Sequence, residues 1–225
     1  MKVTALVPMK GNSERVPNKN LKLFNGVPLY HKVINTLLES RYISEILINT
    51  DSVRIKKDVK NNFSDKVVVI NRPKEIIGDY VSMNKIIEHD INLYKSDLYI
   101  QTHSTNPLLK TDSIDTAIEK FIEKEKDEFD SVFSVTRLQT RLYDIEGKAF
   151  NHNPEELIRT QDLPPLYEEN SNFYIFTRKS FSESNNKRIG CAPYMFEIDK
   201  IEALDIDEPQ DFLIAEAIDK IYNNI

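Results

Sequence analysis

The sequence predicts an α/β fold of three layers, in which helices cover both faces of a mostly parallel β-sheet. Short apolar runs of strand length alternate with stretches of helical spacing along most of the chain. The runs are rich in valine and isoleucine, as strands buried on both faces are. Such alternation is typical of parallel sheets with helical crossovers. Because 225 residues suffice for one large core, we expect a single domain over residues 1–225.

The expected strands and helices follow in order along the chain. Apolar runs predict strands at residues 3–8, 44–50, 66–71, 97–102, 130–135, 172–176 and 201–206. Apolar stripes at helical spacing predict helices at residues 28–40, 82–94, 112–125 and 209–222. From about residue 137 to residue 170 turn signals replace this alternation. A loop of this length is improbable inside a compact domain, so we expect residues 137–170 to be an excursion that packs against a second copy of the chain.

Composition excludes several classes of protein. A net charge of −6 argues against nucleic acid or an anionic membrane surface as the main partner. The single cysteine, Cys191, excludes an internal disulfide framework and fits a reducing compartment. No stretch approaches the roughly 20 apolar residues that a membrane span needs. We therefore expect a cytoplasmic protein without a nucleic-acid or membrane partner.

The loop after the first expected strand is the first candidate site. Its sequence, VPMKGNSERVPNKN (residues 7–20), holds the cations Lys10, Arg15 and Lys19. Gly11 and Asn12 can adopt tight-turn geometry, and ligands of such sheets bind at the carboxyl ends of strands, where this loop lies. Backbone N–H groups together with these cations would bind an anion, as phosphate loops do, although the Walker pattern is absent. The alternative is a basic loop that is simply solvated.

Two aspartates before the last expected helix form the second candidate site. In an extended segment Asp205 and Asp207 would project to the same face, so that both carboxylates could reach one hard cation. Mg²⁺ suits such a pair, because it accepts few carboxylates and completes its shell with water and phosphate oxygens. The alternative is that Asp207 or Glu208 only caps the last helix, with Pro209 in its first turn.

The opening loop resembles the N-terminal signature of the acylneuraminate cytidylyltransferases, the CMP-sialic acid synthetases. The matching residues are Ser13, Pro17, Lys19, Asn20, Gly26, Pro28 and Leu29, and Glu14-Arg15 is more similar to the loop of CMP-Kdo synthetases. Further similar segments follow in the same order at residues 71–83, 101–109, 129–137, 158–181 and 202–216. The chain departs from the family pattern with lysine for arginine at Lys10, histidine for glutamine at His103 and serine for glycine at Ser171.

The resemblance implies a fold like that of the nucleotide-diphospho-sugar transferases, with residues 137–170 as a small dimerisation arm of a homodimer. The implied reaction transfers CMP from CTP to the anomeric hydroxyl of an acidic 2-keto sugar, such as a sialic-acid-like nonulosonate, and releases pyrophosphate. Mg²⁺ would bind to Asp205 and Asp207. The departures from the family pattern leave the identity of the acid sugar open, and no general base is assigned.

The resemblance also implies roles for individual residues. CTP would be bound by Lys10, Gly11, Asn12, Ser13, Arg15, Lys19, Asn20, Arg72 and Ser82. The sugar would be bound by Gln101, His103, Thr105, Arg159, Gln161 and Tyr174, with Arg159 reaching the cleft of the partner subunit. The residues expected to act in catalysis are Lys10, Arg15, Lys19 and Asp207.

Two other functions remain compatible with the sequence. A metal-dependent glycosyltransferase of similar fold also uses an Asp-x-Asp motif, but that motif normally lies mid-chain. A nucleotide-binding homologue without activity is the second alternative, and Glu14 and His103 are the departures that favour it.

Overall fold

The computed structural model describes residues 1–123 and 129–223. In these residues seven strands form one sheet in the order β5-β4-β1-β6-β8-β7-β9. The strands are β1 (Val3–Leu6), β4 (Ile43–Thr50), β5 (Val67–Asn71), β6 (Leu98–Thr102), β7 (Ser131–Leu138), β8 (Leu166–Phe176) and β9 (Pro193–Glu197). Neighbouring strands are parallel except where β8 pairs with β6 and β7. A short hairpin pairs β2 (Leu23–Phe24) with β3 (Val27–Pro28).

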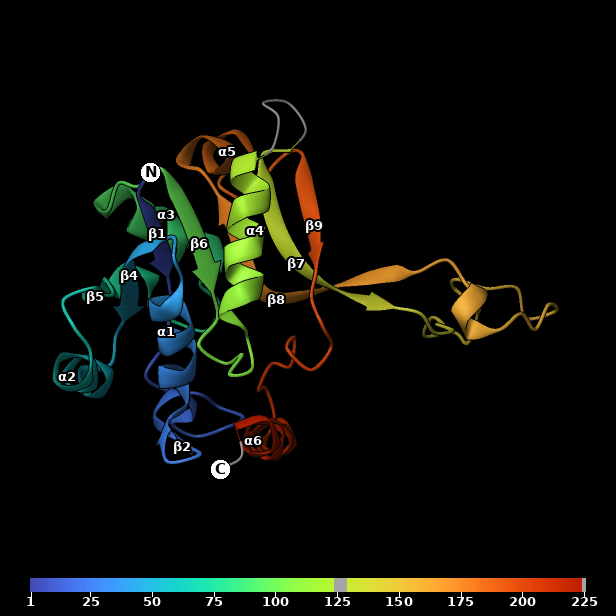
Figure 1. The fold of residues 1–225 in the computed structure, drawn as a ribbon, viewed down its shortest axis with the longest axis horizontal. Coiled ribbons are helices and arrows are strands. Elements are labelled where there is room, and N and C mark those ends of the chain that lie inside the picture. The colour runs from blue at the N-terminus through green and yellow to red at the C-terminus, as the bar shows by residue number, and fades with distance from the viewer. Residues whose placement is uncertain (124–128, 224–225) are drawn as a thin grey trace.

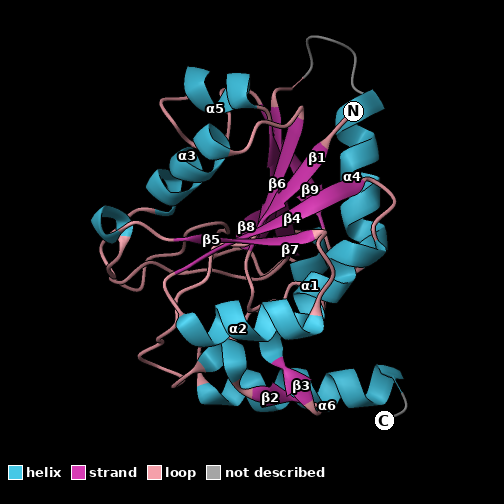
Figure 2. Ribbon diagram, turned by 90° about the vertical axis from the view of Figure 1, so that its left-hand side faces the viewer, coloured by secondary structure: helices cyan, strands magenta, loops and turns pink. Residues whose placement is uncertain are grey.

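Helices cover both faces of the sheet, which confirms the predicted three-layer fold. The helices are α1 (Leu29–Glu39), α2 (Val53–Asn62), α3 (Met83–Leu93), α4 (Thr111–Glu123), α5 (Arg178–Glu183) and α6 (Pro209–Asn223). Figure 2 shows α3 and α5 on one side of the sheet and α1 and α4 on the other. None of the described helices is both long enough and apolar enough to cross a membrane.

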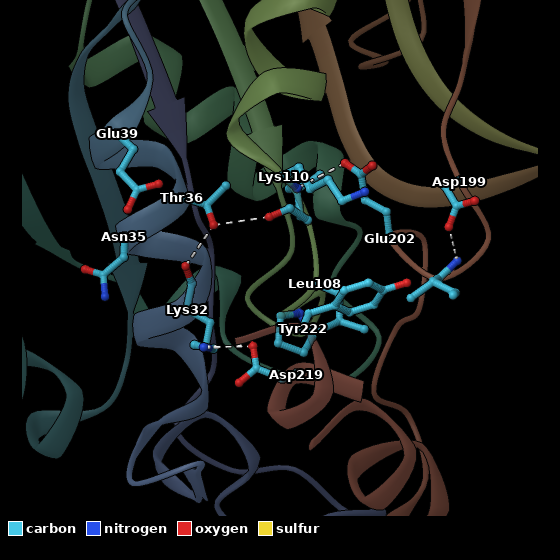
Figure 3. A pocket seen from close by; sticks show the side chains of 13 residues that line it. Lys32, Asn35, Thr36, Glu39, Leu108, Lys110, Asp199, Glu202, Asp219 and Tyr222 are labelled. Atoms are coloured by element: carbon cyan, nitrogen blue, oxygen red, sulfur yellow. Dashed lines mark hydrogen bonds and ion pairs between the residues drawn. The ribbon is translucent and has the colours of Figure 1, made fainter. Parts of the chain in front are cut away.

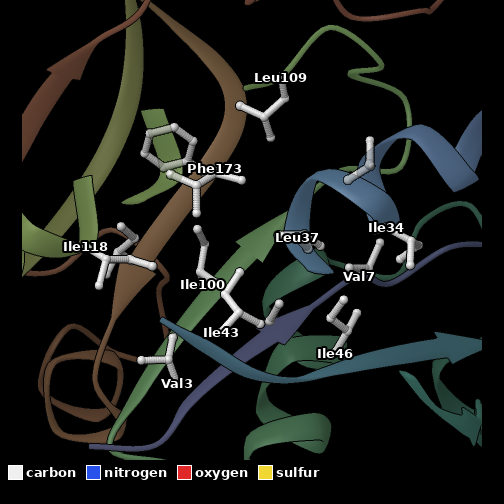
Figure 4. Close-up of a cluster of buried hydrophobic side chains, with 14 of the residues drawn as sticks. Val3, Val7, Ile34, Leu37, Ile43, Ile46, Ile100, Leu109, Ile118 and Phe173 are labelled. Carbon is white, nitrogen blue, oxygen red and sulfur yellow. The ribbon is translucent and has the colours of Figure 1, made fainter. Parts of the chain in front are cut away.

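The core consists of two apolar layers, one on each face of the sheet. On one face, Ile34 and Leu37 of α1 and Ile118 of α4 pack against Ile100 and Phe173 of the sheet (Figure 4). These side chains are fully buried, which is why the strands of the sheet read as continuous apolar runs. On the other face, a second cluster joins the sheet to α3 and α5 through Tyr99, Tyr174, Phe176, Ile87 and Phe181.

A third apolar cluster joins the two ends of the chain. Phe24 of the hairpin and Leu29 of α1 are buried together with Ile206, Phe212 and Ala215, which lie in and just before α6. Figure 1 accordingly shows α6 beside β2 and the start of α1. This cluster holds the segment that carries Asp205 and Asp207 next to the opening loop.

The structure corrects three expectations about the elements. Residues 201–206 form no strand: the amide of Ile206 donates to the Thr105 carbonyl at 3.0 Å and its side chain enters the third cluster. Strand β9 was missed because it pairs only with β7 and is mostly exposed, so it lacks a buried run. Helices α2 and α5 were missed because one is largely polar and the other has only six residues. The expected helix 112–125 is found as α4, and residues 124 and 125 lie outside the described chain.

The excursion at residues 137–170 extends away from the sheet. Strands β7 and β8 pair as far as Leu138 and Leu166, and the segment between them protrudes from the body of the molecule (Figure 1). Large apolar side chains are exposed on this segment at Tyr143, Ile145, Phe150, Leu157 and Ile158. Leu163, in contrast, is 3% exposed and is buried by its own chain, so it is not part of the apolar surface that the excursion leaves for a partner.

Candidate active site

A cleft of about 450 Å³ lies at the carboxyl end of β1, where the sequence placed the opening loop. Most of its lining comes from the opening loop, the turn after β6 and the segment before α6, and Asp79 and Ser171 complete it. The predicted residues that it brings together are Lys10, Asn12, Ser13, Arg15, Lys19, Asn20, His103, Thr105, Asp205 and Asp207. Most of the residues predicted from the two motifs therefore share one site.

The backbone of the opening loop is fixed at its start and free in its middle. The amide of Met9 donates to the Asn49 carbonyl at 3.0 Å, and that of Gly11 donates to Asp51 Oδ1 at 2.8 Å. A Cβ at Gly11 would lie 2.8 Å from the Cβ of Ser52, so only glycine fits this close approach. The amides of residues 12–15 make no hydrogen bond within the described chain, which leaves a run of N–H donors for an anion.

The cations of the loop are paired with carboxylates of the same chain. Arg15 Nη2 lies 2.8 Å from Asp207 Oδ1, and Arg15 Nη1 lies 3.3 Å from Glu208 Oε1. Lys19 Nζ donates to the Ile206 carbonyl and lies 3.5 Å from Asp207 Oδ1. The pKa of Arg15 is raised, chiefly by the negative charge of Asp207 and next by the hydrogen bond to Glu208. The expected basic loop is thus neutralised from across the cleft.

Lys10 makes a separate ion pair at the rim of the cleft. Its Nζ lies 2.5 Å from Asp79 Oδ1, and Asp79 comes from the loop between β5 and α3. Asp79 was only a matching position in the resemblance, with no role assigned to it. The pair joins the opening loop to the loop that carries Ser82.

The two aspartates line the same cleft although they do not lie in a strand. Asp205 interacts with Thr105, burial raises the pKa of its carboxyl group, and its Oδ1 is buried with no hydrogen-bond partner in the described residues. Asp207 points toward Arg15 and Lys19. Asp211, in the first turn of α6, accepts the backbone amides of Asp207 and Glu208, while the Asp207 carboxylate itself pairs with Arg15 and Lys19.

Other residues assigned to CTP lie around the cleft in different environments. Asn20 lines it, but its side chain bridges the Lys10 carbonyl and the Ser104 hydroxyl, which ties the opening loop to the turn after β6. Arg72 donates to the side chain and the carbonyl of Asn49, and it is absent from the described lining. Ser82 caps α3 and lines a neighbouring cavity of about 280 Å³.

The residues assigned to the sugar divide into two groups. Gln101 and Tyr174 are buried in β6 and β8, behind the cleft, and His103 lies at its wall. Arg159 and Gln161 lie on the protruding arm and do not line the cleft of their own chain. Arg159 makes two hydrogen bonds to Asp162, at 2.7 and 3.0 Å.

Two residues that line these cavities had no role in the sequence prediction. Ser171, in the position where the resemblance has glycine, adopts φ 59° and lines both the cleft and an adjoining cavity of about 460 Å³. This left-handed conformation explains why glycine suits the position. Arg188 lies between α5 and β9 and stacks on the Tyr174 ring. No sequence pattern singled out Arg188, because its position depends on long-range packing.

A further cavity, of about 430 Å³, lies between α1 and α6 (Figure 3). Its charged groups pair with one another: Lys32 Nζ lies 2.9 Å from Asp219 Oδ1, and the amide of Lys110 donates to Glu202 Oε1 at 3.0 Å. Burial raises the pKa of Glu202. The Lys32–Asp219 pair joins α1 to α6, and the hydrogen bond from the Lys110 backbone joins the start of α4 to the segment before α6.

The fold is an α/β sheet of three layers, and its cleft sets a loop with three cations and free amides opposite two carboxylates. A family model for cytidylyltransferases matches residues 4–223. The chain therefore belongs to the cytidylyltransferase family, which confirms the resemblance seen in the sequence.

Named relatives are similar in sequence, and a solved structure shares the fold. A pseudaminic acid cytidylyltransferase of Campylobacter jejuni is 28% identical over 98% of this chain and 97% of its own length. An N-acylneuraminate cytidylyltransferase of Danio rerio is 31% identical over 94% of this chain, which matches 50% of the relative. A CMP-2-keto-3-deoxy-manno-octonic acid synthetase solved with CTP has the same fold, with a TM-score of 0.71 at 12% identity over the full length of both chains.

We predict that His103 makes stability depend on pH. Burial, with a smaller contribution from Arg188, lowers the pKa of His103 to about 4. Because an unfolded histidine binds a proton below about pH 6.5, the stability linked to this group is lost as the pH falls from about 6.5 to about 4. Urea unfolding measures the free energy of unfolding at about pH 7 and at about pH 4.5. The decrease in this free energy between the two pH values should therefore be smaller in His103→Gln than in the wild type. His152→Gln, on the arm, is the control and should follow the wild type. Equal losses in His103→Gln and the wild type would contradict the prediction.

Proposed function

We propose that the chain transfers CMP from CTP to the anomeric hydroxyl of an acidic 2-keto sugar and releases pyrophosphate. The observation that carries the proposal is the cleft itself, in which free amides and paired cations of the opening loop face Asp205 and Asp207. Relatives matched over nearly their whole length support an acid sugar as acceptor, since they are named for pseudaminic and legionaminic acids.

The triphosphate would bind to the opening loop. The amides of residues 12–15 supply neutral donors, and Lys10, Arg15 and Lys19 supply positive charge. When the triphosphate binds, phosphate oxygens would replace the Asp207 carboxylate as partner of Arg15 and Lys19. They would likewise replace the Asp79 carboxylate as partner of Lys10. The ion pairs of the cleft thus keep the cations in place until the nucleotide arrives.

The residues of the cleft fit a divalent metal ion. Asp205 has a buried Oδ1 that lacks a hydrogen-bond partner among the described residues, and Asp207 lines the same cleft. The described residues hold no cluster of three or more histidine, cysteine or acidic side chains, and Mg²⁺ bound together with a nucleotide needs only one or two carboxylates. When bound, Mg²⁺ would neutralise negative charge on the phosphates. We therefore propose Asp205 and Asp207 as its protein ligands.

Catalysis would depend mainly on positioning. The acceptor hydroxyl attacks the α-phosphorus in line with the departing pyrophosphate, and such transfers gain most from orientation and charge stabilisation. Arg15 and Lys19 lie where they can hold the phosphates, and Asn20 fixes the loop that presents them. The free thiol of Cys191 is compatible with a cytoplasmic reaction.

We further propose that the chain forms a homodimer through the arm at residues 137–170. The arm exposes large apolar side chains away from the body, and an isologous contact would bury them with one self-complementary surface. Arg159 lies on this arm and is 72% exposed as a side chain, so it is available to reach the cleft of the partner subunit.

The nucleotide preference tests the proposed reaction. With Mg²⁺ present, CTP should bind clearly more tightly than ATP, GTP or UTP, because a site built for one base leaves buried groups unpaired with another. Calorimetry measures the four affinities, and pyrophosphate release with a panel of acid sugars measures turnover. Equal affinity for the four triphosphates would contradict a cytidylyltransferase. Tight CTP binding without turnover on any acid would instead favour an inactive homologue.

Subunit complementation tests the role of Arg159. Arg159→Ala and Lys19→Ala should each be nearly inactive, because each lacks one component of every site. In a mixed dimer one site collects both defects and the other has none. Unfolding and refolding an equal mixture should therefore restore about a quarter of wild-type activity, since half the dimers are mixed and each has one intact site. Mixed dimers without activity would show that Arg159 does not complete the partner's site.

A further inference from the structure

Arg188 is a partly buried cation with few partners. Its side chain is 18% exposed, and its guanidinium carbon lies 3.7 Å from the centre of the Tyr174 ring. Nη1 donates to Gln101 Oε1 at 2.7 Å, and Nη2 lies 3.9 Å from Glu169 Oε1, beyond hydrogen-bond distance. Within the described chain this is one hydrogen bond for a group with five N–H donors. Burial lowers the pKa of Arg188, as expected for an incompletely paired cation.

Two further unpaired nitrogens lie near Arg188. Gln101 Nε2 belongs to the amide group that accepts from Arg188, and it is buried without a hydrogen-bond partner in the described residues. His103 Nε2, two residues further along the chain, is also buried without a partner there. Gln101 Nε2 is a donor, and His103 Nε2 donates in one of its two neutral forms. Buried donors without acceptors are rare in folded proteins and require an explanation.

Arg188 and His103 line different cavities, each of which shares residues with a third, whereas Gln101 is buried behind the guanidinium group of Arg188. Arg188 lines the cavity of about 280 Å³ together with Ser82 and Glu169. Glu169 also lines the cavity of about 460 Å³, which shares Ser171, Asp205 and Asp207 with the main cleft. The cavity beside Arg188 and the cleft beside the aspartates therefore both adjoin the cavity of about 460 Å³.

We propose that Arg188, supported by Gln101, binds an sp² oxygen of the acceptor sugar and so contributes to the choice of acceptor. Such an oxygen would accept from the free N–H groups of Arg188, whose guanidinium group is held by the hydrogen bond from Nη1 to the buried Gln101 Oε1. The acids in question carry it as a carboxylate or as the carbonyl of an acylamino group. This inference rests on the proposed function, because it requires an acid sugar in the cavities beside the aspartates. Arg188 is a binding residue here, since it lies apart from the opening loop that would hold the phosphates.

The test uses Arg188→Met, which keeps an apolar side chain on Tyr174 and removes every donor. Arg178→Met is the control, because Arg178 is likewise an arginine that donates hydrogen bonds within the chain, to the Ile91 carbonyl and Asn92, and it lines none of these cavities. We measure CTP affinity, the melting temperature and pyrophosphate release with N-acetylneuraminate and with 2-keto-3-deoxy-manno-octonate, which has no acylamino group. Arg188→Met should raise KM for the acid by about ten- to a hundredfold, as the loss of a charged hydrogen bond does, and leave CTP affinity as in Arg178→Met.

The pattern across the acids identifies the oxygen. A rise in KM with both acids indicates the carboxylate, and a rise with the acylated acid alone indicates the amide carbonyl. If Arg188→Met melts well below the control, Arg188→Lys decides, because it retains a cation and should give an intermediate KM. An unchanged KM, or a parallel loss of CTP affinity, would overturn the inference and leave the proposed function intact. A wild type that releases no pyrophosphate with any acid would overturn the proposed function and this inference with it.

Discussion

The contact of Lys19 and Arg15 with the segment at residues 206–208 is the interaction on which the site depends. Lys19 donates to the Ile206 carbonyl, and both cations pair with Asp207. Below them, the side chain of Ile206 packs with Phe24 and Phe212. Apolar burial therefore brings the two ends of the chain together, and the charges above it align the cations with the carboxylates. The Lys19 side chain is only 12% exposed, so its pairing is less screened than that of a surface lysine.

This arrangement gives the empty cleft a balanced charge. Cations held close together without carboxylates would repel one another, and so would carboxylates without cations. The ion pairs offset this repulsion while no nucleotide is bound. A triphosphate brings several negative charges and displaces the carboxylates from the cations. The displaced carboxylate of Asp207, together with Asp205, whose Oδ1 has no hydrogen-bond partner among the described residues, would then be available to the proposed divalent ion. Nucleotide and metal would thus enter the site together, each satisfying the groups that the other releases.

The sequence predicts most of the layers and much of the site, because both depend on local patterns. The buried strands read as apolar runs, and the opening loop reads as three cations in a turn-forming segment. The prediction of a strand at residues 201–206 is wrong because Ile206 is buried by α6 and the hairpin, which no local pattern reveals. In the structure Gly11 permits a close contact with Ser52, and Asn20 bridges two loops. The spacing of residues in the sequence does not distinguish these structural roles from ligand binding. The sequence around Arg188 contains no pattern that marks it, since its partners Gln101 and Tyr174 lie on β6 and β8, far from it along the chain.

The exchange of ion partners is tested most directly by the affinity for CTP with and without Mg²⁺. Calorimetry would compare the wild type with Asp207→Asn, and with Glu208→Gln as a control that removes the longer contact to Arg15 at 3.3 Å. The account predicts that Asp207→Asn binds metal-free CTP severalfold more tightly than the wild type, because the cations are released and one repulsive charge is gone. It also predicts that Asp207→Asn loses most of the gain in affinity that Mg²⁺ gives the wild type, whereas Glu208→Gln keeps it. An Asp207→Asn variant that binds CTP more weakly without metal, yet gains as much from Mg²⁺ as the wild type, would contradict the account.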